Sequence, residues 1–150
     1  MSESEYHHLT YDLTLAAATT IASVTAERFT FCYVSGEGTD NTERGRAAWA
    51  RTKGKTENAL LRLPFKAAFM FRPGYVQPLK GIRSKTRWYQ ALYDGIGPFY
   101  PLFRVLLPRY VTTTVNIGRA MIQVAARGYS KQILFSADIN QLSAAAESAR

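Results

Sequence analysis

The chain has 150 residues, of which 47 % are hydrophobic and 20 % charged, and a formal net charge of +8. This composition excludes disordered and fibrous proteins, and the length predicts a single domain, residues 1–150, with its own hydrophobic core. The acidic, polar N-terminus is not a signal peptide, and no apolar run reaches the roughly 20 residues that cross a bilayer. The only cysteine, Cys32, lies in an apolar run as a small hydrophobe, so the sequence favours a soluble protein of the reducing cytoplasm.

Charge is distributed unevenly along the chain. Residues 1–43 hold seven acids and one base, whereas residues 44–131 hold seventeen bases and two acids. Such a basic block favours an anionic partner, although a solvated surface is an equally open interpretation.

The first half of the chain predicts helices alternating with short strands. Residues 8–26 form a helix with one apolar stripe, made of Leu9, Leu13, Ala16, Ala17, Thr20, Ile21 and Val24. The aromatic and β-branched run 29–34 predicts a buried strand, followed by a loop rich in Gly, Asp and Thr. A helix over 46–62 and a second buried strand over 66–72 come next.

In the second half of the chain, the sequence predicts secondary structure clearly only near the C-terminal end. Residues 85–94 support a short helix, and residues 95–110 contain three prolines. A helix over 112–128 begins at a threonine cap and ends at Gly128 in the left-handed conformation. A third strand over 131–136 and a final helix follow.

This alternation predicts an α/β fold with a parallel sheet covered by helices on both faces. Three strands make a narrow sheet, and the first predicted element is a helix with no strand before it. The fold class predicted from these elements is therefore α/β, with a narrow parallel sheet flanked by helices.

Three segments carry a resemblance to a known family, namely YVSGEGTD (33–40), TKGKTEN (52–58) and FRPG (71–74). Their order and spacing resemble the second half of the short-chain dehydrogenase/reductase superfamily, in particular its atypical, extended type, the NAD(P)-dependent epimerase/dehydratase-like proteins. The similarity covers about residues 11–142. It implies an oxidoreductase- or epimerase-like function with NAD or NADP as cofactor.

The resemblance also implies a catalytic group. The family's catalytic serine falls on Ser35 and its lysine on Lys53, while its tyrosine falls on Trp49. An indole N–H donates a hydrogen bond but cannot exchange a proton near neutral pH, so the acid–base role is vacant. The loop after the second strand lies beside the nicotinamide in the family, which makes the implied cofactor-binding residues Lys53, Arg72, Pro73, Gly74, Tyr75 and Val76.

The cofactor half of the family's fold is missing from this sequence. No Gly-rich strand–turn–helix, which would seat the cofactor pyrophosphate, occurs in it. The resemblance therefore implies a partial Rossmann-type parallel sheet flanked by helices, without the N-terminal Gly-rich βαβ half. We expect a lone chain to be inactive or incomplete. Its unpaired sheet edge predicts a homo-oligomer or a complementary N-terminal half.

Plainer interpretations stay open beside these. Lys53 can be one solvated base among many, Trp49 a packed aromatic and Ser35 a strand-end turn residue. Within the implied substrate-side subdomain, 77–110, bases alternate with aromatics, which suits an anionic membrane surface better than nucleic acid. The alternative function is thus a non-catalytic interaction module with a basic surface. Adjacent His7 and His8 lack metal-ligand spacing, so no metal site is expected.

Overall fold

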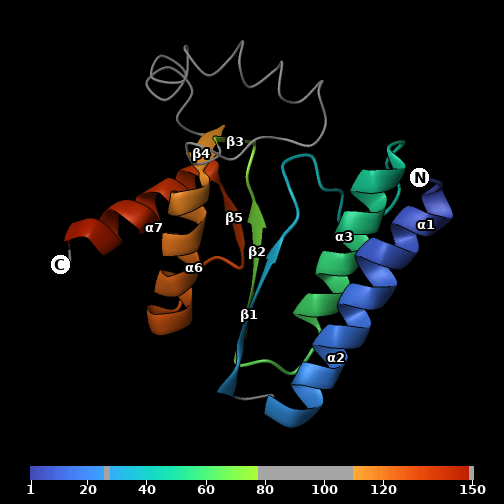
Figure 1. The fold of residues 1–150 in the computed structure, drawn as a ribbon, viewed down its shortest axis with the longest axis horizontal. Helices are drawn as coiled ribbons and strands as arrows, with labels where there is room; N and C mark the ends of the chain where they lie inside the picture. Colours follow the sequence, from blue (N-terminus) through green and yellow to red (C-terminus); the bar gives the residue numbers. More distant parts are fainter. Residues whose placement is uncertain (26–27, 78–109, 149–150) are drawn as a thin grey trace. The chain divides into compact units, whose positions relative to one another are not determined.

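The computed structural model describes residues 1–25, 28–77 and 110–148. The chain forms two compact units, the first made of Met1–Arg72 with Gly128–Ile133 and the second of Pro73–Arg127 with Leu134–Arg150 (Figure 1). The predicted helix over 85–94 lies outside the described residues, as does nearly all of the substrate-side subdomain with its basic and aromatic side chains. The single-domain organisation and the membrane surface therefore stay predictions.

A small parallel sheet confirms the predicted α/β class. Its strands follow the order β1-β2-β5, with bounds Thr30–Val34, Ala67–Arg72 and Ile133–Phe135, and helices flank it. Strand β1 runs parallel to β2, with Thr30 opposite Ala67 and Val34 opposite Phe71. All three predicted strands are present within two residues of their expected bounds.

The N-terminal helical run is longer than predicted. It comprises α1 (Glu3–His7), a π-helical turn η1 (His8–Asp12) and α2 (Leu13–Thr25). The expected start at residue 8 is wrong because Ser2 caps the helix, its hydroxyl accepting the N–H of Glu5 at 3.1 Å. The spacing of Ser2 and Glu5 is that of a capping box.

The apolar stripe of this run faces outward along much of its length. Leu9 and Leu13 are each 50 % exposed and Val24 is 80 % exposed, whereas Ala18 and Ala22 are buried. Small side chains on the buried face allow close packing against neighbouring elements.

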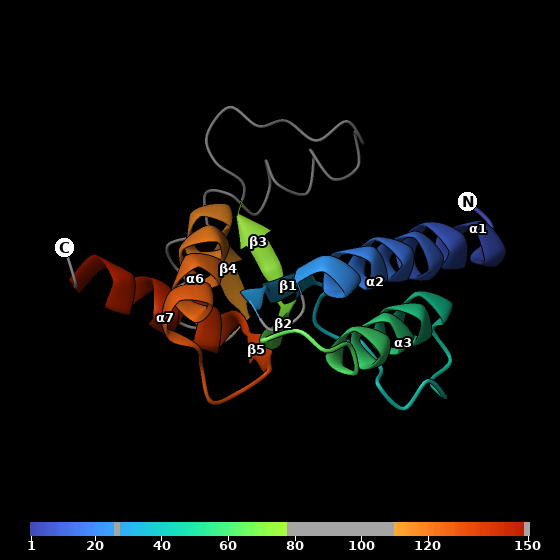
Figure 2. The ribbon, with the colours of Figure 1, turned by 90° about the horizontal axis from the view of Figure 1, so that it is seen from below.

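The core of the first unit joins α2 and α3 (Ala48–Leu61) to the two long strands. Ala18, Leu60, Ala68 and Met70 form its centre, and the rings of Phe31 and Phe65 stack at its rim with centroids 5.0 Å apart. Helices α2 and α3 lie side by side in both views (Figure 2). This packing fixes α3, which carries the predicted catalytic lysine.

The second unit contains two strands that were not predicted. Strands β3 (Tyr75–Gln77) and β4 (Val111–Thr113) pair in parallel beside α6 (Thr114–Arg127) and α7 (Ser136–Ser148). As predicted, a threonine caps α6, the Thr113 hydroxyl accepting the N–H of Asn116 at 3.0 Å, and Gly128 follows with φ +72°. Within the described ranges, no helix has the length and apolar character needed to cross a bilayer.

Candidate functional site

The candidate site lies in the first unit, where two parallel strands end at the same edge. Ser35 follows β1 and Arg72 is the last residue of β2, and the N–H of Ser35 donates to the carbonyl of Phe71 at 2.9 Å. In open α/β sheets, the carboxyl ends of the strands are where ligands bind.

A fully buried ion pair holds this edge to α3. The carboxylate of Glu57 is 0 % exposed and is bound by both ends of the Arg72 guanidinium: Nε donates to Oε1 at 3.0 Å and Nη2 to Oε2 at 2.5 Å. A bidentate arginine–carboxylate pair of this kind fixes orientation as well as charge. We call it the Glu57–Arg72 pair.

Neutral polar side chains complete the shell of this carboxylate. The Ser35 hydroxyl donates to Oε1 at 2.5 Å, and the Asn41 amide donates to Oε2 at 2.9 Å. Arg72 Nη2 also donates to the side-chain oxygen of Asn41, and the Asn58 amide donates to the Asn41 carbonyl at 2.9 Å. These bonds form a network that is buried at its centre and partly exposed at Asn41 and Asn58. It links β1, the loop after it, α3 and β2.

The loop between β1 and α3 touches the helix backbone at one point. A Cβ on Gly54 would lie 1.8 Å from the carbonyl oxygen of Asp40, so only glycine permits this approach. The Asp40 carboxylate accepts the Thr42 hydroxyl at 2.6 Å and the Gly45 N–H at 2.7 Å. These hydrogen bonds lower the pKa of Asp40, and the bond from the Thr42 hydroxyl contributes most.

Ser35 is buried, and its polar groups are already engaged. Its hydroxyl hydrogen goes to Glu57, with Phe71 O a longer second acceptor at 3.3 Å. The sequence-based prediction gives this serine hydroxyl the role of holding a substrate oxygen. Here the same hydroxyl proton is directed into the protein, so only an oxygen lone pair remains for a ligand.

Lys53 is the half-buried cation of the site. Its Nζ donates to the main-chain carbonyl of Ser35, at the end of β1. Burial lowers the pKa of Lys53, and the charge of Glu57 partly opposes that shift. No carboxylate in the described ranges lies within 4.0 Å of Nζ. Because an ammonium has three N–H donors, two remain for a ligand.

Trp49 lies one helical turn before Lys53 and is 44 % exposed. The edge of its indole ring packs over Gly38, where an added Cβ would meet the ring carbon Cη2 at 3.2 Å. Gly38 has φ +83°, a conformation that favours glycine. The indole therefore covers the loop after β1 and presents no group that can transfer a proton.

The remaining predicted cofactor residues belong to the second unit. Pro73 is buried, the N–H of Gly74 donates to the Ser136 hydroxyl at 3.0 Å, and Tyr75 and Val76 form part of β3. The structure thus brings Ser35, Lys53 and Arg72 together, and the roles of all the predicted site residues stay predictions.

Sequence reasoning missed Glu57 and Asn41. A signal for Glu57 was available, because it follows Lys53 by four residues, on the same face of α3, and is one of two acids in a strongly basic block. Asn41 gave no comparable signal, since it lies in a loop of polar residues.

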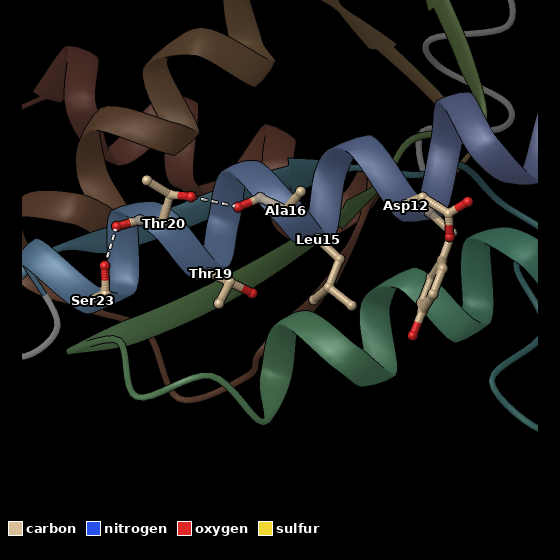
Figure 3. Close-up of a pocket in the computed structure, with 7 residues that line it drawn as sticks. Asp12, Leu15, Ala16, Thr19, Thr20 and Ser23 are labelled. Carbon is tan, nitrogen blue, oxygen red and sulfur yellow. Dashed lines mark hydrogen bonds between the residues drawn. The ribbon is translucent and has the colours of Figure 1, made fainter.

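A shallow pocket over the N-terminal helical run is not a competing site. Its lining comes from η1 and α2 alone, and Figure 3 shows most of these side chains along one helix. The hydroxyls of Thr20 and Ser23 donate to the carbonyls of Ala16 and Thr20, at 2.9 and 2.8 Å. Their protons therefore serve the helix and not a ligand.

Two further findings bear on identity. Among the described residues, no group of three or more His, Cys, Asp or Glu side chains could hold a metal ion. Comparison with protein-family models and with curated proteins finds no match to this sequence.

Proposed function

We propose that the first unit carries the nicotinamide-ribose side of an NAD(P)-dependent oxidoreductase- or epimerase-like site. The observation that supports this most directly is the position of Lys53, whose ammonium is held at the carboxyl end of β1 by the Ser35 carbonyl. A ribose presents hydroxyl oxygens, which accept hydrogen bonds from an ammonium. The donors at this edge therefore fit that end of the cofactor.

The buried network would keep this edge in place. The Glu57–Arg72 pair joins α3 to the end of β2. Ser35 contacts both elements, through its hydroxyl to Glu57 and through its N–H to the Phe71 carbonyl. A ligand would then meet a preformed edge with one cation on it, which reduces the ordering cost of binding. When bound, the nicotinamide would supply hydride chemistry, and this chain's residues would orient it.

Turnover by the chain alone is not part of the proposal. Trp49 leaves the tyrosine's role unfilled, and the sequence has no Gly-rich turn for the pyrophosphate. A complementary half carrying that turn, from another chain or a second copy, would complete the cofactor site.

A fluorescence titration with NADH and NADPH tests the proposal. Wild type should bind one of them saturably, and Lys53→Gln should weaken binding about tenfold to a hundredfold, because a charge-assisted hydrogen bond contributes about 1.5–3 kcal/mol. Lys66→Gln is the matched control, since Lys66 is exposed and lies outside α3. It makes the same charge change and should leave the affinity unaltered.

Two outcomes would count against the site. A folded wild type that binds neither nucleotide would rule out a stand-alone cofactor-binding protein. Equal losses in Lys53→Gln and Lys66→Gln would show that binding depends on overall charge and not on this edge of the sheet.

A further inference from the structure

We propose that Lys53 is itself the acid–base group of this site and takes the role that Trp49 cannot fill. The inference rests on the proposed function, because it assigns the proton-transfer step of that same site. It starts from one juxtaposition: Trp49 and Lys53 stand one turn apart on α3, and Lys53 Nζ reaches the end of β1.

The geometry holds the amine in a defined place. The Ser35 carbonyl accepts one N–H of Nζ, and Ser35 is anchored by its own N–H to Phe71 and by its hydroxyl to Glu57. The contact between Gly54 and Asp40 fixes α3 at the residue next to Lys53. The ammonium is therefore positioned by both its helix and its strand, with two N–H bonds left over.

Other candidate acids at this edge are committed elsewhere. The Ser35 hydroxyl proton goes to Glu57, and the Glu57 carboxylate is buried against Arg72. Tyr33, the tyrosine of β1, packs against the core, and its pKa is raised chiefly by burial. Lys53 is a partly accessible amine whose Nζ already lies against the Ser35 carbonyl, whereas the exposed carboxylate of Glu37 lies two residues further along the loop.

The surroundings of Lys53 favour release of that proton. The charge that acts on it is that of Glu57, four residues later on α3, which opposes release of the proton, and that carboxylate is itself bound by Arg72 in the buried pair. Burial then lowers the pKa of Lys53 from its ordinary value. A lower amine pKa brings the group closer to the range in which general acid–base catalysis is efficient.

The step balances with a reduced nicotinamide as the hydride source. As a substrate carbonyl carbon gains the hydride, the carbonyl π pair moves onto oxygen. The oxygen takes a proton from Lys53, whose N–H bond breaks while the electron pair stays on nitrogen. An alcohol and a neutral amine result, and the amine regains a proton from water. In the oxidative direction, the neutral amine removes the hydroxyl proton.

Pulsed reductive methylation tests the inference on the chain alone. Formaldehyde and cyanoborohydride would be applied briefly across a series of pH values, and each lysine followed by peptide mass spectrometry. Only the neutral amine reacts, so each lysine reports its own titration. We expect the labelling of Lys53 to rise at a lower pH than the labelling of Lys66, the exposed comparator.

A Lys53 profile that coincides with that of Lys66 would overturn the inference. So would a Lys53 that stays unlabelled until the chain unfolds, because an inaccessible amine cannot exchange a proton with a ligand. Failure of the proposed function is seen separately, as absent nucleotide binding by wild type.

Discussion

Removing the arginine of the Glu57–Arg72 pair should destabilise the first unit strongly. Arg72→Met keeps an unbranched side chain of moderate length but deletes the Nε and Nη2 donors that bind Glu57 at 3.0 and 2.5 Å. The carboxylate stays 0 % exposed and keeps only the donors from Ser35 and Asn41. An uncompensated buried charge of this kind costs about 3–5 kcal/mol of unfolding free energy.

A second substitution separates the charge from the packing. Glu57→Gln together with Arg72→Met removes both charges and keeps one side-chain oxygen that can accept from Ser35. Since replacing both members of a buried pair is often nearly neutral, we expect the double variant to recover about 2 kcal/mol relative to Arg72→Met alone.

Urea unfolding followed by tryptophan fluorescence measures these differences. Trp88→Phe in every variant leaves Trp49 as the only tryptophan, so the signal comes from α3. Lys66→Met, at an exposed position, is the control and should change stability by less than about 0.5 kcal/mol. A loss below about 1 kcal/mol in Arg72→Met, or a double variant less stable than the single one, would refute the reasoning.

Further predictions concern glycine, cysteine and leucine positions. Gly54→Ala should cost about 1–3 kcal/mol or more in urea unfolding, because its Cβ would overlap a loop carbonyl, whereas Gly118→Ala meets nothing within 4 Å and should gain up to about 1 kcal/mol. Burial raises the pKa of Cys32 to about 11, so a thiol reagent at pH 8 should label it only on unfolding, and rapid labelling of the folded chain would contradict this. For the same reason, the stability of the folded chain should fall as the pH rises from 9 toward 11. Leu13→Ala should change stability by less than about 0.5 kcal/mol and Leu60→Ala should cost about 2–5 kcal/mol, which thermal or urea unfolding distinguishes; equal costs would show that the outward stripe is covered.

Much of the fold could be predicted because it rests on local patterns. The runs at 29–34 and 66–72 are short, apolar and rich in aromatics, and the observed bounds of β1 and β2 are close to the predicted ones. Strands β3 and β4 have three residues each, as β5 has, but their sequences YVQ and VTT lack the unbroken apolar run ILF that indicates β5. Their pairing depends on contacts between residues about 36 positions apart, which no local window contains.

The site was predictable only in part for a related reason. The resemblance placed Ser35 and Lys53 in one site, and the structure brings them into contact across 18 residues of sequence. The partner of Arg72 could not be predicted, because it depends on how α3 is rotated against the strands. That rotation is set by Leu60 in the core and by the close approach at Gly54. Neither residue indicates in the sequence that Glu57 will pair with Arg72.

The buried network and the lysine together suggest what Ser35 contributes to the site. Replacing a buried ion pair by a well-packed apolar pair is often neutral or stabilising, so a buried pair is weak evidence of a purely stabilising role. What the pair adds is direction: it takes the Ser35 hydroxyl, while Phe71 takes the Ser35 N–H, and the Ser35 carbonyl is left pointing at Lys53. In the proposed site, the serine would therefore act through its main-chain oxygen and not through its hydroxyl. The structure thus holds the amine of Lys53 at a strand end by a fixed carbonyl, and under our proposal this amine is the group that acts on a ligand.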